Sequence, residues 1–300
     1  METIGVDLGN CNIKTSKGII VPSLITRGEN YLISTGYQLE FNNEILIIGE
    51  GDYDTNLDKI SKENLLPMLC LALGLSTKEE FIRIVLGLPI NQYRSKKDKM
   101  IEVIEDNKIL NFKLNGVERT IYIEEAAIFP EGVATYYSLD VDKRRELIEK
   151  DLIVLDIGGR TTDIALLKAG KKRSVAKSTS LDVGMINIYN DMINEINSLY
   201  TLGLNIEDAE GIIKNGLEVD GEKKDTEFIK DIIRNNIERV FKELNISYPV
   251  RTSPILVTGG GGRSFFKSIK RRYPSARMIE DNLFSNANGY KRVGEKLWID

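Results

Sequence analysis

Hydrophobic residues along this chain fall into two successive series of short apolar runs and amphipathic segments. In the first series, short apolar or alternating runs predict strands at residues 3–8, 12–16, 19–21, 44–48, 81–88, 111–114 and 117–123. Segments with helical spacing predict helices at residues 62–74, 92–106 and 130–139. Asn115-Gly116 suits a type I′ turn, so the last two strands are predicted to pair as a hairpin.

A second series follows a charged stretch at residues 140–151, which is the best candidate for a domain boundary. Its predicted strands lie at residues 152–155, 163–168, 173–178 and 255–258, and its helices at 185–199, 206–214, 227–244, from 263 onward and at 286–297. Because hairpin-length turns join the first strands of each series, we expect mixed sheets. The repetition predicts an α/β protein with two related domains around a cleft, residues 1–140 and 141–284. The terminal helix, at about 285–300, is expected to dock on the first domain.

Composition narrows the possible chemistry. The chain has 300 residues, of which 42% are hydrophobic and 29% charged, and its net charge of −4 gives no general attraction to nucleic acid or to an anionic membrane. It has no His, which excludes Ser-His and Cys-His catalysis and the commonest zinc ligand. Cys11 and Cys70 have no paired spacing, and no run approaches the roughly 20 apolar residues of a membrane span. We therefore expect a cytoplasmic protein whose chemistry uses carboxylates, hydroxyls, Lys and a hard metal ion.

One motif occurs twice, at residues 6–14 and 155–163, and in each copy an apolar run delivers an Asp and then a Gly turn with small polar residues. Such a turn directs amides and hydroxyls at phosphate oxygens, while Asp7 or Asp156 holds a hydrated cation. A single Asp-x-Gly is more often only a tight turn, but its recurrence in the same context favours a phosphate clamp. Lys14 occupies the position equivalent to Asp163, and it either reaches the phosphates or is a solvated strand residue. Of Thr161 and Thr162, we expect one to donate to phosphate and the other to reflect β propensity.

Two further segments are chemical candidates. The run at residues 259–262 is four consecutive glycines between a strand and a helix, so a base or ribose could lie against its backbone; a flexible linker is the alternative. Glu131 follows Pro130 at a predicted helix start. It is either an ordinary residue of a first helical turn or a carboxylate that orients a water molecule in the cleft.

These motifs resemble the superfamily of actins, heat-shock chaperone ATPases and sugar kinases. Its two phosphate motifs are similar to residues 7–14 and 156–163, its adenosine motif to 257–261, and its first connecting helix to 129–134. The four occur in the family's order and span almost the whole chain. The short length and the closing residues 285–290 are most similar to bacterial ParM-type actin-like proteins, which segregate plasmids.

The resemblance implies an actin-like fold of two RNase H-like domains, with ATP or GTP and Mg²⁺ in the cleft. By position, Asp7 and Asp156 hold the hydrated Mg²⁺ and Glu131 polarises the attacking water. The implied nucleotide contacts are Gly9, Asn10, Asn12, Lys14, Gly158, Gly159, Thr161, Thr162, Gly259, Gly260 and Gly261. Arg160 departs from the small residue usual in the second motif, so that turn is either wider or directs Arg160 away. Glu210 and Lys214 are named as candidates for adenine contact.

The implied function is an ATPase (or GTPase) that polymerises into filaments and segregates plasmid DNA through a DNA-bound adaptor of the ParR type. Self-association is thus expected, and direct binding to nucleic acid or membrane is not. A non-polymerising small-molecule kinase or chaperone-like nucleotidase is the leading alternative, and either would need a substrate-binding insertion or a peptide-binding domain. A scaffold with a vestigial nucleotide site is the third class, against which Asp7, Glu131 and Asp156 argue.

Overall fold

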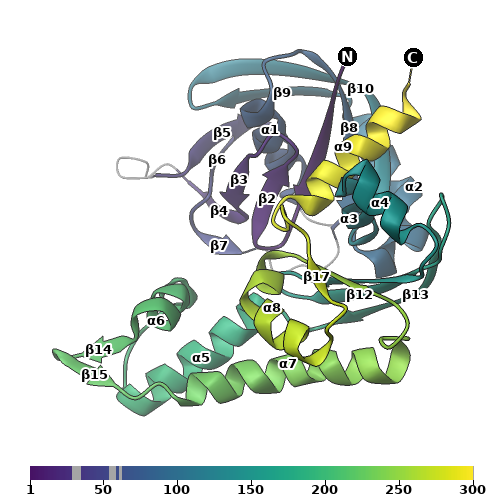
Figure 1. Ribbon diagram of the computed structural model, residues 1–300. Helices are drawn as coiled ribbons and strands as arrows, with labels where there is room; N and C mark the ends of the chain where they lie inside the picture. The colour runs from purple at the N-terminus through teal and green to yellow at the C-terminus, as the bar shows by residue number, and fades with distance from the viewer. Residues whose placement is uncertain (29–34, 54–58, 61–62, 300) are drawn as a thin grey trace.

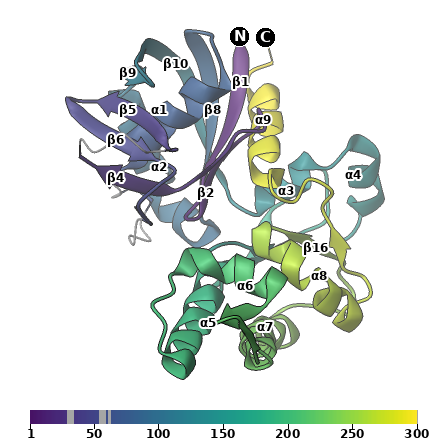
Figure 2. The same ribbon diagram turned by 90° about the vertical axis from the view of Figure 1, so that its left-hand side faces the viewer.

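The computed structural model describes residues 1–28, 35–53, 59–60 and 63–299, and it contains two large sheets that form the upper and lower parts of the molecule in Figure 2. The first is a ten-stranded mixed sheet of order β3-β2-β1-β8-β10-β9-β5-β6-β4-β7. Its strands are β1 (Glu2–Leu8), β2 (Asn12–Thr15), β3 (Ile20–Pro22), β4 (Leu24–Arg27), β5 (Tyr37–Phe41), β6 (Glu44–Ile48), β7 (Asp52–Tyr53), β8 (Phe81–Leu88), β9 (Ile109–Leu114) and β10 (Val117–Pro130).

Helices α1 (Leu65–Ser76) and α2 (Ile90–Asp106) pack on one face of this sheet. The sequence of α1 is apolar all round, and most of its side chains are buried, as expected of a helix enclosed by a core. Only one stripe of α2 is apolar, and its Met100 and Ile104 enter the same core. Short helices α3 (Val133–Ser138) and α4 (Val141–Leu147) then lead to the second sheet.

The second sheet has five strands in the order β13-β12-β11-β16-β17. These strands are β11 (Leu152–Ile157), β12 (Thr162–Leu167), β13 (Val175–Leu181), β16 (Ile255–Thr258) and β17 (Arg277–Met278). The helices of this half are α5 (Met185–Tyr200), α6 (Ala209–Asn215), α7 (Phe228–Ser247) and α8 (Gly260–Arg272). A small hairpin of β14 (Leu217–Val219) and β15 (Glu222–Lys224) lies beside α6 at the far end of α5 (Figure 1). No helix in the described part of the chain is both long and apolar enough to cross a lipid bilayer.

The last helix, α9 (Ser285–Leu297), runs alongside β1 and contacts β8 and α3 in the first half (Figure 2). Glycines make this contact close: a Cβ on Gly5 of β1 would lie 2.7 Å from the Lys291 amide nitrogen, and one on Gly87 of β8 would lie 2.6 Å from the Tyr290 ring. Tyr290 is fully buried as a result. The end of the chain is thus built into the face of the first sheet.

Several predicted elements differ from the structure. The weakly patterned region before residue 43 contains β4 and β5, whose side chains are mostly only partly buried and therefore give a weak alternation. β10 continues to Pro130, so the predicted helix at 130–139 shortens to α3, and Gly132, with φ +72°, separates the two. The charged stretch at 140–151 contains α4. The start of the helix predicted at residues 62–74 falls outside the described residues, and α1 itself begins at Leu65.

Candidate active site

The repeated motif forms two β-hairpin turns with the same register. Asp7 pairs with Lys14 across β1 and β2, and Asp156 pairs with Asp163 across β11 and β12. Each turn is closed by the same kind of hydrogen bond, from the Gly9 amide to the Asn12 carbonyl at 3.1 Å and from the Gly158 amide to the Thr161 carbonyl at 2.9 Å. The sequence repeat is therefore a repeat of backbone structure.

The two turns face and touch each other. A Cβ on Gly159 would lie only 3.0 Å from the Cβ of Cys11, so the second turn packs directly on the first. Beside this contact is a cleft of about 770 Å³, lined by residues from both halves of the molecule. Its volume is in the range of small-molecule and cofactor sites.

Ion pairs organise the acidic residues of the first half. Lys14 Nζ lies 3.0 Å from Asp7 Oδ2; Asp7 is buried and Lys14 is partly buried. Burial opposes ionisation of Asp7, but the charges of Lys14 and Lys59 outweigh it and lower the pKa of this carboxyl. Lys59, which is 3% exposed, pairs with Glu131 Oε1 and also donates to the Gly87 carbonyl at 3.4 Å. Asp7 and Glu131, the two cleft carboxylates of the first half, are therefore each paired with a lysine.

Asp156 and Asp163, the two cleft carboxylates of the second half, form no ion pair with a lysine of the described residues. Burial raises the pKa of Asp156 to about 6, although the charge of Lys14 and a hydrogen bond from Asn286 oppose the shift. Burial, and next the charge of Glu131, raise the pKa of Asp163 to about 7. Positive charge on this side of the cleft comes from Arg160 and Arg263 in its lining, and a bound cation near Asp156 and Asp163 would favour their ionised forms.

The glycine run provides a close backbone approach to one of these carboxylates. Gly259 has φ +82° and ψ 161°, and a Cβ there would lie 2.7 Å from the carbonyl carbon of Ile157 and still closer to Asp156 Oδ1. Helix α8 begins at Gly260, so the amides of its first turn border the cleft. Gly259 is consequently a constrained residue between strand and helix, and the next three glycines begin α8, so the run is not a linker.

The structure brings nearly all of the predicted site residues into one cleft. Its lining includes Asp7, Gly9, Asn10, Asn12, Lys14, Glu131, Asp156, Gly158, Gly159, Thr161, Gly259, Gly260 and Gly261. Thr162 differs from the prediction, because its fully buried hydroxyl donates to the Val183 carbonyl at 2.6 Å. Arg160, whose orientation the sequence left open, is among the residues that line the cleft. Of the two candidates for adenine contact, Glu210 is in the lining and Lys214 is not.

Sequence reasoning missed several lining residues. Lys59 and Asn286 carry polar groups to the carboxylates from distant parts of the chain, and no local motif marks either one as a site residue. The rest of the missed set comprises Cys11, Pro22, Leu24 and Tyr53 of the first half and Met185, Ile186, Tyr189, Ile206, Glu207, Arg263, Ser264 and Leu283 of the second. For Met185, Ile186 and Tyr189 a signal was available, because α5 begins two residues after Val183, whose carbonyl accepts from Thr162 of the second motif.

The carboxylates fit a hydrated Mg²⁺ better than a dehydrated metal. Within residues 1–28, 35–53, 59–60 and 63–299, no group of three or more acidic or Cys side chains is arranged to hold a metal ion directly. Mg²⁺ usually keeps several waters and binds through one or two carboxylates together with phosphates. Asp7 and Asp156 suit that role, and Asp163 Oδ1 is a buried oxygen with no protein partner in the described structure.

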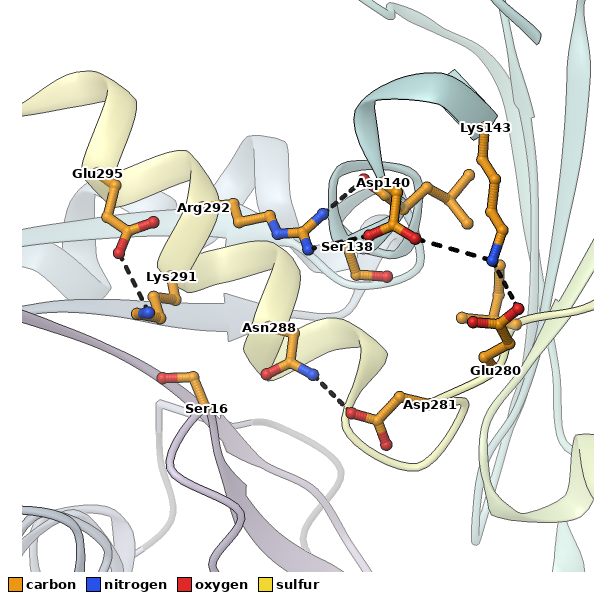
Figure 3. A pocket seen from close by; sticks show the side chains of 12 residues that line it. Ser16, Ser138, Asp140, Lys143, Glu280, Asp281, Asn288, Lys291, Arg292 and Glu295 are labelled. Atoms are coloured by element: carbon orange, nitrogen blue, oxygen red, sulfur yellow. Dashed lines mark hydrogen bonds and ion pairs between the residues drawn. The ribbon is translucent and has the colours of Figure 1, made fainter. Parts of the chain in front are cut away.

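A second hollow, of about 370 Å³, lies on the outer side of α9 and is bordered mainly by α9, the α3–α4 connection and the segment before α9 (Figure 3). Its charged groups pair with one another: Lys143 with Glu280 at 2.6 Å, Arg292 with Asp140 at 3.6 Å, and Lys291 with Glu295 at 3.2 Å. None of the predicted site residues lines it. We therefore assign the functional site to the larger cleft.

Comparison with solved structures supports this fold over the whole chain. A 15-stranded ParM filament from Clostridium botulinum has a TM-score of 0.83 and 24% identity, with 99% of this chain and 100% of that chain covered. An archaeal actin homologue in complex with ADP has a TM-score of 0.82 and 21% identity, again with 99% and 100% covered. Crystallised apo pSK41 ParM has a TM-score of 0.69 and 22% identity, with 98% and 97% covered. A comparison with curated protein sequences found no match.

Family models divide the chain in the same way as its two sheets. Residues 5–133 match the model for the N-terminal domain of actin-like proteins. Residues 154–271 match the model for the C-terminal domain of archaeal actin homologues of the MreB-like type. Since both models describe actin-like proteins, occur in the expected order and together cover most of the sequence, the chain belongs to the actin-like protein family.

Proposed function

We propose that this protein is an actin-like ATPase that assembles into nucleotide-dependent filaments. The observation that carries the proposal is the pair of equivalent turns in direct contact beside a cleft that contains Asp7, Asp156 and Glu131. Support also comes from relatives of similar fold, one of them a ParM filament and another an ADP complex. The proposed nucleotide is ATP, with GTP as the alternative to be compared in the same assays.

In this proposal the residues of the two halves have different tasks. Lys14 provides a positive charge for the phosphate oxygens, and the turn of the first half provides amide and side-chain hydrogen-bond donors. Thr161 donates its hydroxyl from the second turn. Glu131, held by Lys59 at the junction of β10 and α3, orients a water molecule toward the terminal phosphate. Mg²⁺, when bound through water at Asp7 and Asp156, would neutralise charge on the phosphates.

We further propose that the filament moves plasmid DNA through a DNA-bound adaptor of the ParR type. The ParM-like fold supports this role, and the net charge of −4 favours an adaptor over direct contact with DNA. Pelleting of filaments with a labelled plasmid, with and without proteins encoded beside this gene, tests the step. Equal DNA recovery with and without every such protein would contradict it.

Light scattering and phosphate release, recorded together after ATP and Mg²⁺ are added, test the main proposal. We expect scattering to rise and phosphate to follow, and we expect Glu131→Ala and Asp156→Ala to slow phosphate release by about 100-fold or more. Hydrolysis as fast as the parent in either variant would refute the assigned roles. Hydrolysis with no rise in scattering over a range of protein concentrations would instead favour a non-polymerising nucleotidase.

A further inference from the structure

Asn286, in the first turn of α9, connects the two halves of the cleft through a single carboxamide. Its Nδ2 donates to Asp156 Oδ2 at 2.9 Å, and its Oδ1 accepts from the Gly132 amide at 3.0 Å and from Thr135 Oγ1 at 3.3 Å. Asp156 ends a strand of the second sheet, whereas Gly132 directly follows Glu131 in the first half. One side chain therefore binds the Asp156 carboxylate directly and also binds the backbone of the residue that follows Glu131.

The orientation of this carboxamide follows from its partners. A backbone amide can only donate, so the atom facing Gly132 must be the oxygen, and the NH₂ group must then face Asp156. Ala at this position would remove all three hydrogen bonds. Asp at this position would keep the oxygen that accepts from Gly132. It would lose the hydrogen bond to Asp156, because an ionised carboxylate has no hydrogen to donate, and it would place a second negative charge beside that residue.

Neighbouring side chains extend the connection to the glycine run. Ser285 Oγ is hydrogen-bonded to Thr258 Oγ1 at the end of β16, and Asn282 Nδ2 donates to the Gly259 carbonyl at 2.8 Å. The Ser285 and Thr258 hydroxyls are buried, so these bonds are protected from competing water. The segment from Asn282 to Asn286 thus holds the second sheet at the same place where Asn286 reaches the first half.

We propose that Asn286 is a positioning residue that sets the Asp156 carboxylate and the Glu131–Gly132 turn in one fixed relation across the cleft. The inference rests on the proposed ATPase function. In that function the nucleotide is bound mainly through the two turns, whereas the hydrogen bonds of Asn286 go to Asp156, Gly132 and Thr135. Hydrolysis additionally requires the carboxylates of both halves to be placed together, so removal of Asn286 should slow turnover much more than it weakens binding.

The test compares Asn286→Ala with Asn288→Ala in the full chain. Asn288 lies in the same helix, two residues further on, and its Nδ2 donates to Asp281 Oδ2 at 2.7 Å on the outer side, away from the cleft (Figure 3). Each variant therefore loses one asparagine side chain and its hydrogen bonding from α9. Partners that orient a ligating carboxylate typically contribute about 10- to 100-fold to activity, so we expect kcat of N286A to fall by that factor. Its KM for ATP should stay within about threefold of the parent, and N288A should match the parent in both.

A second variant, Asn286→Asp, has almost the same shape and keeps the test valid if N286A does not fold, as judged by circular dichroism. Its kcat should fall at least as far as that of N286A, because the donor is replaced by a like charge. A parent-like kcat in a folded Asn286 variant, or equal losses in N286A and N288A, would overturn the positioning role. A parent chain that hydrolyses no ATP would instead overturn the proposed function, and this inference with it.

Discussion

Gly259 offers a sharp test of how the glycine run shapes the site, because its neighbour Gly260 provides a matched control. With φ +82° and ψ 161°, Gly259 occupies a backbone region that is essentially restricted to glycine. An added Cβ would lie 2.7 Å from the Ile157 carbonyl carbon and still closer to Asp156 Oδ1. At Gly260, the nearest atom to an added Cβ is Leu283 Cδ1 at 3.8 Å, which is an ordinary contact.

The expected free energies follow from these geometries. In Gly259→Ala, the backbone strain costs about 1–3 kcal/mol and the overpacking a further 1–3 kcal/mol, since the nearest atoms are backbone and a carboxylate fixed by hydrogen bonding. In Gly260→Ala, the contact is unstrained, and Ala is the better helix former by about 0.5–1 kcal/mol. We therefore expect G259A to be less stable by about 2–6 kcal/mol and G260A to equal or slightly exceed the parent.

Thermal unfolding followed by circular dichroism or calorimetry measures this difference. At about 2–4 °C per kcal/mol for chains of this size class, G259A should melt roughly 4–24 °C below the parent. ATP hydrolysis by G259A should also slow, because the Asp156 carboxylate must move to admit the new methyl group. Equal melting temperatures for G259A and G260A would refute the assignment of Gly259 to a strained turn against Asp156.

Three further predictions concern single side chains of the cleft. Because burial raises the pKa of Asp163 to about 7, the folded protein binds more protons than the unfolded chain between about pH 4 and 7, and its stability falls as the pH rises through that window. Asp163→Asn should flatten this pH dependence in melts recorded with a chelator. Parallel profiles of melting temperature against pH for variant and parent would contradict the reasoning. Lys59→Met should destabilise the protein by about 3 kcal/mol in denaturant unfolding, because it leaves the partly buried Glu131 carboxylate without its partner. Adding Glu131→Gln should recover much of the loss, and a strictly additive double variant would exclude the pairing. Thr161→Val should weaken nucleotide affinity with little change in melting temperature. Thr162→Val should instead cost about 1 kcal/mol of stability and leave nucleotide affinity unchanged. The reverse pattern would show that the two roles were misassigned.

Local sequence signals predicted the two turns well, because each carries its information in consecutive residues. The apolar run before Asp156 reads directly as a buried strand, and Gly158 permits the turn that follows. The strand at 255–258 and its glycine run were equally explicit, since the run would be costly in a folded region without a structural reason. These features predicted the doubled α/β architecture and most of the cleft.

Contacts between distant segments were not predictable in the same way. Lys59 reaches Glu131 from 72 residues away, and Asn286 reaches Asp156 from 130 residues away, so each looks like an ordinary polar residue in its own segment. The roles of Thr161 and Thr162 depended on which face of β12 meets Val183, which lies beyond the next strand. Side-chain roles that depend on tertiary packing require the three-dimensional arrangement.

The close packing of α9 has a consequence for the order in which the chain can fold. Val85 of β8 and Ala134 of α3 share a small apolar cluster with Tyr290, although Tyr290 follows Val85 by more than 200 positions in the sequence. Gly289 reinforces this cluster, because a Cβ there would lie within 3.0 Å of the Ala134 backbone. During synthesis, this face of the first sheet must stay open until the second half has been made and α9 arrives. The two halves should consequently fold as one cooperative unit, and residues 1–140 expressed alone should expose the uncovered face and aggregate.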